Sequence, residues 1–506
     1  MTAVRAPSLE TVGMSKSFGA LKALQNVSIQ VPAGSFHALL GENGAGKSTL
    51  VKCIMGFYKP DRGQLLIDGT ETTVRNPRDA QALGVGMVYQ HFTLVPALTA
   101  AENLVVSRAD APGVIDWRKE RRALEAFLDT MPFRVPLKKP VSAMAAGEKQ
   151  KLEILKLLYL NQRFLILDEP TSVLTPGEAD EILGLLRGMA HRGEITVAMI
   201  SHKFREVEAF CDDFTVLRRG ARVGGGKVGA VSTRDMAAMM IGDAVVRPSA
   251  SRSTTQRNGG ATLEIAGLFA ENDEGRDAVN GFNIRVRPGE IVGIAGVSGN
   301  GQSELVEALS GQRPIKLGQV LIRDVNFEPT RDHYDRFKVF GLPEEPLKNA
   351  SVPTMSVAEN MAFRRFDKAP MSRLGLWLSR EPMRATARDL ISRYNVKTPS
   401  TETQIRDLSG GNVQRAVLAR ELSGDVDVLI VANPCFGLDF ASVADIRAQI
   451  MEQRNRGAAV LLVSEDLDEV LELSDRIAVM SGGKVAYLTE GAGADRTTIG
   501  RYMAGH

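Results

Sequence analysis

The sequence predicts an α/β protein made of two tandem copies of one domain, each built on a mostly parallel sheet. A glycine-rich loop pattern lies between an apolar strand-like run and a helical run, and the same series of motifs recurs in the second half. Apolar strands alternate with helices in both halves, which favours a parallel sheet covered by helices on its two faces. The length of 506 residues independently favours two to four domains.

Composition excludes several other classes of protein. Apolar content of 44% and charged content of 24% are typical of a globular chain. The balance of 62 basic and 60 acidic residues argues against a dedicated nucleic-acid binder. Neither a long uncharged apolar window nor a signal-peptide pattern at Met1 to Ser17 is present. The scattered Cys53, Cys211 and Cys435 predict a reducing compartment and buried apolar roles for the thiols.

The first element of interest is the stretch 41–48, which fits the pattern G-x-x-x-x-G-K-[ST]. It follows a predicted buried strand at 36–40 and leads into a predicted helix at 49–55. The glycines allow backbone N–H groups to surround phosphate oxygens, and the helix N-terminus adds positive charge. The alternative is a glycine turn that only precedes a helix. The predicted phosphate-binding residues are Gly41, Glu42, Asn43, Gly44, Ala45, Gly46, Lys47, Ser48 and Thr49, with Lys47 on the β- and γ-phosphates and Ser48 also on Mg²⁺.

The repeat is visible in four motifs that return in the same order. The pairs are 41–48 with 296–303, 101–103 with 358–360, 144–148 with 408–412, and 167–170 with 431–434. Two unrelated domains would not produce matching order at matching intervals. The polar, Ser/Thr/Gly-rich stretch 247–262 is predicted to be a flexible linker, which leaves domains at 1–246 and 263–506.

Further candidate residues follow predicted strands of the first half. Asp168 ends an apolar strand and is placed to hold Mg²⁺, while the adjacent Glu169 is a candidate general base; the alternative is a solvated acidic pair. Gln90 is a candidate for Mg²⁺ or the attacking water, and His202 for the γ-phosphate. Phe18 is a candidate for stacking on adenine. The alternatives are that Gln90 is a polar surface residue, that His202 is a structural histidine and that Phe18 is a core residue.

This order of motifs resembles the nucleotide-binding subunits of ABC transporters, over nearly the whole chain and twice. The resemblance implies two P-loop NTPase domains of the ABC type, each with an antiparallel β subdomain and a helical subdomain, that use ATP and Mg²⁺. It also implies that each ATP lies between the Walker motifs of one half and the signature of the other. Signature residues Ser409, Gly410 and Gly411, together with Asp439, would then face the first half's ATP.

The residues that depart from the family pattern all belong to one of the two expected interfaces between the halves. The first half's Walker motifs and the second half's signature are complete. At the other interface a lysine, an aspartate, a glutamate, a glutamine, a histidine, a signature serine and a further aspartate are replaced; the replacements are Gln302, Ala432, Asn433, Glu344 or Glu345, Glu465, Ala145 and Thr175. We therefore expect one hydrolytic site and one site that at most binds nucleotide through Gly296, Gly299, Gly301 and Ser303.

The fused pair looks similar to the subfamily that serves simple sugars and nucleosides in bacterial importers. The run 87–96 looks most similar to the branch paired with basic-membrane-lipoprotein-type binding proteins. The resemblance implies transmembrane permease subunits, a substrate-binding protein reached through them, pairing of the two halves within one chain, no nucleic acid, and a peripheral place at the cytoplasmic face of the inner membrane. Residues 92–96 are expected near the groove for a permease helix. The alternatives are a soluble tandem ATPase acting on ribosomes or DNA, and a nucleotide-sensing regulator.

Overall fold

The computed structural model describes residues 6–42, 44–89, 92–108, 110–131, 133–171, 174–201, 203–241, 252, 262–297, 299–373, 377–436, 438 and 440–503. The chain forms two compact units, residues 1–244 and 245–506. Most of the predicted linker lies outside the described residues, so the domain bounds 1–246 and 263–506 stay predictions.

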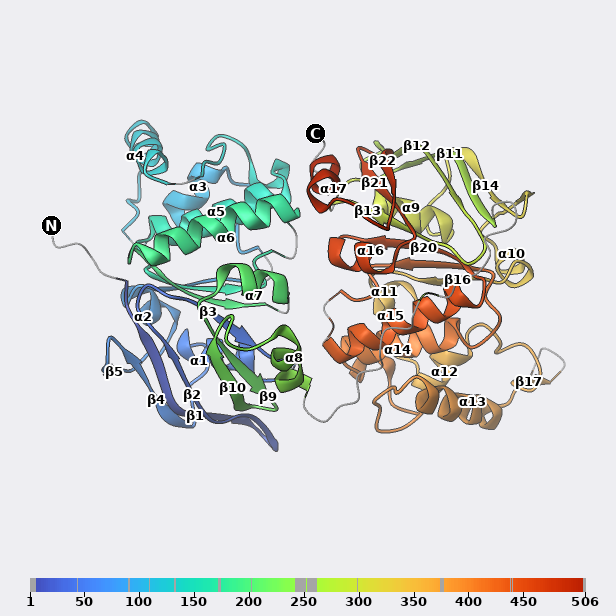
Figure 1. Cartoon of the computed structure of the whole chain (residues 1–506), viewed down its shortest axis with the longest axis horizontal. Helices are drawn as coiled ribbons and strands as arrows, with labels where there is room; N and C mark the ends of the chain where they lie inside the picture. The colour runs from blue at the N-terminus through green and yellow to red at the C-terminus, as the bar shows by residue number, and fades with distance from the viewer. Residues whose placement is uncertain are drawn as a thin grey trace. The chain divides into compact units, whose positions relative to one another are not determined.

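Each half has the same two sheets, as Figure 1 shows. The smaller sheet is antiparallel, with strand order β2-β1-β4-β5 in the first half and β12-β11-β14-β15 in the second. Its strands are β1 (Leu9–Phe18), β2 (Leu21–Val31), β4 (Arg62–Ile67) and β5 (Thr70–Thr72), then β11 (Leu263–Glu271), β12 (Asp277–Val286), β14 (Leu317–Ile322) and β15 (Val325–Asn326). This confirms the antiparallel β subdomain.

The larger sheet is parallel except at one edge, with order β10-β9-β3-β8-β7-β6 and, in the second half, β22-β21-β13-β20-β19-β16. In the first half the strands are β3 (Phe36–Leu40), β6 (Val85–Val88), β7 (Phe164–Asp168), β8 (Thr196–Ile200), β9 (Asp213–Arg218) and β10 (Ala221–Lys227). In the second they are β13 (Ile291–Ala295), β16 (Val339–Leu342), β19 (Val428–Ala432), β20 (Ala459–Ser464), β21 (Arg476–Ser481) and β22 (Lys484–Glu490). Every residue of β3 and β13 is buried, as expected for a central parallel strand.

Helices cover these sheets and form a separate helical part in each half, made of α3–α5 and of α12–α14 (Figure 1). The first half has α1 (Lys47–Ile54), α2 (Pro77–Ala82), α3 (Ala100–Val106), α4 (Trp117–Asp129), α5 (Ala146–Tyr159), α6 (Pro176–His191), α7 (Phe204–Phe210) and α8 (Thr233–Ile241). The second has α9 (Gln302–Leu309), α10 (Arg331–Arg336), α11 (Pro346–Asn349), α12 (Val357–Ala362), α13 (Arg380–Arg393), α14 (Gly410–Glu421), α15 (Phe440–Asn455), α16 (Leu467–Leu473) and α17 (Arg496–Met503). It also carries a small hairpin of β17 (Ser372–Arg373) and β18 (Trp377–Leu378).

The repeated Ala-Glu-Asn motif has a structural explanation. Thr99 begins α3 through a capping box with Glu102, and the Asn103 amide spans carbonyls of the preceding loop. Ser356 and Asn360 make the same bonds at α12. The motif therefore fixes the entry of each chain into its helical part, rather than carrying chemistry.

Two other observations concern the sequence predictions. Cys53 and Cys211 are buried as expected. Cys435 is half-buried as a residue, and its buried thiol lies against the charged groups of Glu469 and Arg447, so the apolar surroundings predicted for it are wrong. Among the described residues, we find no helix with the length and apolar character needed to cross a bilayer.

Candidate nucleotide site

The loop between β3 and α1 depends on glycine at two positions. Gly41 has φ 152° and Gly46 has φ 104°, both in the region that favours glycine. A Cβ on Gly41 would collide with the Leu217 carbonyl oxygen, and one on Gly46 would lie 2.7 Å from the Ala23 carbonyl oxygen. The left-handed Gly46 is the N-cap of α1, so the helix begins at Lys47, two residues before the predicted start.

Lys47 lies over its own loop. Its ammonium donates to the carbonyl oxygens of Gly41 at 2.6 Å and Glu42 at 3.1 Å. Burial lowers the pKa of Lys47, and the carboxylates of Glu169, Asp168 and Glu42 oppose that shift. The ammonium is therefore held where phosphate oxygens would replace backbone carbonyls as its acceptors.

The acidic pair stands at the carboxyl end of β7, and β8 separates this strand from β3 in the sheet. Burial raises the pKa of Asp168, the neighbouring Glu169 raises it further, and Lys47 and Lys52 oppose the shift. Glu169 has φ 49°, and its N–H donates to the Ile200 carbonyl oxygen at 2.9 Å. Because parallel strands share one carboxyl edge, the fold brings both carboxylates within electrostatic reach of Lys47.

This arrangement fits a magnesium ion that is shared with a nucleotide. The candidate donors, the Ser48 hydroxyl and the Asp168 carboxylate, are hard oxygens, and burial, together with the neighbouring Glu169 charge, raises the pKa of Asp168. No group of three or more His, Cys, Asp or Glu side chains able to hold a metal was found among the described residues. Mg²⁺ is commonly bound by one or two protein oxygens plus phosphates and water, and the two candidate oxygens here would be the protein's share of such a set.

The second half builds the same frame with different side chains. Gln302 replaces Lys47 and is only 6% exposed, and its Nε2 has no hydrogen-bond partner among the described residues. Asn433 has φ 43° and donates its N–H to the Val463 carbonyl oxygen at 2.8 Å, as Glu169 does to Ile200. The Asn433 side chain is engaged in structure, since its Oδ1 accepts from the Glu465 N–H at 2.9 Å.

The cavity beside these residues is acidic. The Ser303 hydroxyl donates to Glu344 at 3.4 Å, and Glu307, Glu344 and Glu465 all line a space of about 40 Å³. None of the described residues lining it is a lysine or an arginine. A polyphosphate entering this space would meet carboxylates without the charge-assisted donors that favour its binding.

The two signature segments also differ. Ser409 is exposed at the start of α14, where its Oγ accepts from Asn412 Nδ2 at 2.8 Å, and Gly410 has open space around it. In the first half, Ala145 offers no hydroxyl, and a Cβ on the neighbouring buried Gly147 would collide with the Glu178 carboxylate. The second half's signature thus presents an exposed helix N-terminus with a hydroxyl.

Phe18 stands at the end of β1 and is 42% exposed, so it is not a core residue. Its ring packs edge-on against Tyr58 at 5.1 Å, with the Lys16 ammonium 5.5 Å from the ring centroid. Its contact with adenine stays a prediction. The remaining predicted residues Asn43, Gln90, His202 and Asp439 lie outside the described residues.

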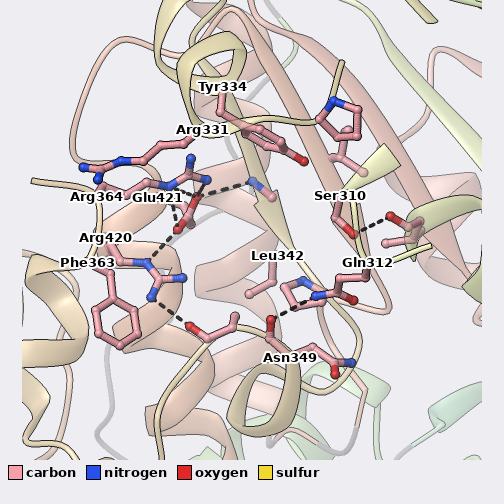
Figure 2. Close-up of a pocket in the computed structure, with 16 residues that line it drawn as sticks. Ser310, Gln312, Arg331, Tyr334, Leu342, Asn349, Phe363, Arg364, Arg420 and Glu421 are labelled. Atoms are coloured by element: carbon pink, nitrogen blue, oxygen red, sulfur yellow. Dashed lines mark hydrogen bonds and ion pairs between the residues drawn. The ribbon is translucent and has the colours of Figure 1, made fainter. Parts of the chain in front are cut away.

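The second half also has a groove of about 360 Å³ between its core sheet and its helical part, shown in Figure 2. Arg364 and Arg420 both donate to the buried Glu421 on one side, and Gln312 donates to the Asn349 carbonyl oxygen at 3.2 Å on the other. Leu342 lies between these groups. Since Leu342 ends β16 just before the Glu344 segment, the groove adjoins the acidic cavity.

One buried cluster of the first half was not predicted from the sequence motifs. Glu206 is 2% exposed and accepts hydrogen bonds from Thr171 and Ser201. The signal was available in the repeat, because a glutamate follows the strand-end serine by five residues in both halves, at Glu206 and Glu469.

Comparison with known proteins decides the family. The model of the family described as ABC transporter matches residues 24–172 and 279–435. The chain belongs to the ABC transporter family. This ABC chain is 37% identical to the glucose import ATP-binding protein TsgD13 of Haloferax volcanii, over 99% of this chain and 96% of that protein. It is 35% identical to the guanosine import ATP-binding protein NupO of Bacillus subtilis, over 98% and 97% respectively.

A solved structure of the archaeal ribosome recycling factor aABCE1, in complex with the stalk protein aP1, covers 97% of this ABC chain and 92% of its own, with a TM-score of 0.64. At 17% identity this likeness shows the fold alone. The fold, the family and the class of ATP-hydrolysing enzyme expected from the sequence are confirmed.

Proposed function

We propose that the chain is the ATP-hydrolysing motor subunit of a bacterial importer for a simple sugar or a nucleoside, with one hydrolytic site and one degenerate site. The proposal rests on the way the substitutions are distributed between the two halves. Lys47, Asp168 and Glu169 gather at one sheet edge of the first half. The matching edge of the second half has Gln302 and Asn433 and an acidic surround.

In the proposed reaction the two halves pair head to tail. ATP binds on the first half's loop, with Lys47 on its phosphates, and Ser409 with the N-terminus of α14 closes over it from the second half. Glu169 accepts a proton from the attacking water, and Ser48 with Asp168 would hold Mg²⁺. Bound there, Mg²⁺ would neutralise charge on the phosphates. Each charge-assisted bond missing from the other site is worth about 1.5–3 kcal/mol, so several losses together disfavour turnover there.

The work is delivered to permease partners. The relatives named above are import ATP-binding proteins, and a motor without a spanning helix among its described residues needs a membrane partner to move solute. Phe92 and Val95 are 37% and 46% exposed just after β6, and the groove beside Leu342 follows the equivalent β16. We place cytoplasmic segments of the permease at these two sites, at the cytoplasmic face of the inner membrane.

The proposal defines the transported solute only as a class. One relative is named for glucose and another for guanosine at nearly the same identity, so likeness to them does not separate a sugar from a nucleoside. A substrate-binding protein, reached through the permease, would make that choice.

Affinity purification of the full chain from membranes tests the proposal. We expect a polytopic membrane protein to co-purify and ATP hydrolysis by that complex to respond to a sugar- or nucleoside-binding protein. Recovery with ribosomes or nucleic acid instead would support the soluble tandem ATPase. Recovery without either partner, with no hydrolysis, would support a nucleotide-sensing regulator.

A further inference from the structure

A carboxylate that the proposed chemistry does not use lies behind the nucleotide site of the first half. Glu206 belongs to α7 and is 2% exposed. Its two oxygens have different partners: Oε1 accepts from the Thr171 hydroxyl at 2.6 Å, and Oε2 accepts from the Ser201 hydroxyl at 3.3 Å. A buried carboxylate is costly unless it is bonded, so these contacts hold it in a defined place.

The two hydroxyls come from the loops that carry the proposed reaction. Thr171 follows Glu169 by two residues, and Ser201 directly precedes His202 in the chain. Glu206 therefore ties the segment after the general base to the end of β8. The two loops are 30 residues apart in sequence, and the Glu206 side chain bonds to both of them.

Lys203 closes the cluster. Its backbone N–H donates to the Ser201 hydroxyl at 3.1 Å, and its ammonium donates to the Thr171 carbonyl oxygen at 3.2 Å. The same ammonium lies 3.6 Å from Glu206. The charge of Glu206 is thus balanced locally, and both loops are bonded to the lysine and to the glutamate.

The second half provides an internal comparison. Glu469 occupies the same place in α16, accepts from the Ser464 hydroxyl at 2.7 Å, and is 1% exposed. Its neighbours on the other side have changed, since Cys435 stands where Thr171 does and Arg447 lies 3.8 Å away. The carboxylate and its bond to this loop position are kept, but the donor is the Thr171 hydroxyl in the first half and the Cys435 thiol, a weaker donor, in the second.

We propose that Glu206 is a positioning residue for hydrolysis, which holds the Glu169 loop in register with the end of β8 through Thr171 and Ser201. This rests on the proposed function of the first half. A small displacement of a general base from its water is costly, because about 1 Å of misplacement can lower a rate by about 100-fold.

The test is the full chain carrying Glu206→Gln, compared with Glu469→Gln as the matched change in the second half. In E206Q we expect kcat for ATP hydrolysis to fall by about 10–100-fold while KM for ATP stays near wild type. E469Q should keep kcat. Equal kcat losses in both variants, or a rise in KM without loss of kcat in E206Q, would show a merely structural role and overturn the proposal.

A second pair of variants tests the same hydrogen bond by changing Thr171 instead of Glu206. Thr171→Val removes the donor with little change of shape, and Thr171→Ser keeps the donor. We expect kcat to fall in T171V far more than in T171S, and the losses in T171V and E206Q to be non-additive when combined. Additive losses would contradict a shared hydrogen bond.

Hydrolysis abolished by Glu169→Gln but unchanged by E206Q would refute only this inference, whereas hydrolysis that survives Glu169→Gln would refute the proposed function.

Discussion

Replacing Glu169 by glutamine is the sharpest single perturbation of the proposed site. The amide keeps the size of the side chain, and the φ of 49° and the hydrogen bond to Ile200 belong to the backbone, so the local fold should persist. The change removes proton acceptance. Loss of a general base costs about 10²–10⁴-fold in rate, which is about 3–5 kcal/mol of barrier.

Nucleotide binding should respond in the opposite direction. The Glu169 charge raises the pKa of Asp168 and adds negative potential beside Lys47. Removing it makes the site less repulsive to a polyphosphate, so ATP affinity should stay the same or increase. The account thus predicts lost turnover together with retained binding.

The assay is steady-state phosphate release at saturating Mg²⁺ and ATP, with equilibrium binding of a fluorescent ATP analogue and a melting curve on the same preparation. Asn433→Ala at the matching position of the second half is the comparison, and it should lower turnover far less. Turnover near wild type in Glu169→Gln, or an equal loss in Asn433→Ala, would refute the reasoning.

Three further predictions follow from the same structure. Burial raises the pKa of Asp168 on folding, so ionisation of this carboxyl destabilises the chain as pH rises through that pKa. Asp168→Asn should therefore raise the melting temperature of the nucleotide-free chain at neutral pH while abolishing Mg²⁺-dependent hydrolysis. Burial lowers the pKa of His37 from 6.5 to about 4, so the free energy of unfolding should decline by up to about 3 kcal/mol as pH falls through this window. His37→Val copies Val292 of the second half and should flatten that decline in denaturant titrations. Gln302→Lys should restore no second turnover, because Ala432 still lacks the magnesium-side carboxylate; a doubled kcat would contradict this.

The parts of the site that sequence could predict are those fixed by the backbone. Gly41 and Gly46 are required by positive φ and close carbonyls, so their spacing alone indicated the loop. Asp168 and Glu169 were predictable because an apolar strand must end at the shared carboxyl edge of the sheet. The repeat also lets the sequence alone show which residues differ between the halves.

Other features depend on contacts between distant residues. The bond between Thr171 and Glu206 joins residues 35 apart, and no local pattern marks it. Cys435 was predicted to be a buried apolar thiol, but the partners that decide its surroundings, Arg447 and Glu469, come from helices α15 and α16. Such ties are set by packing, so a pattern within one segment does not contain them.

The central claim is that the first half hydrolyses ATP and the second half supplies the signature. It is tested most directly by trapping radiolabelled ADP with vanadate in the full chain, cross-linking the ADP by light, and cleaving between the halves. The account predicts one trapped ADP per chain, on the fragment that contains Lys47, and no trapping in Ser409→Arg. Two ADP per chain, or label on the fragment that contains Gln302, would contradict it.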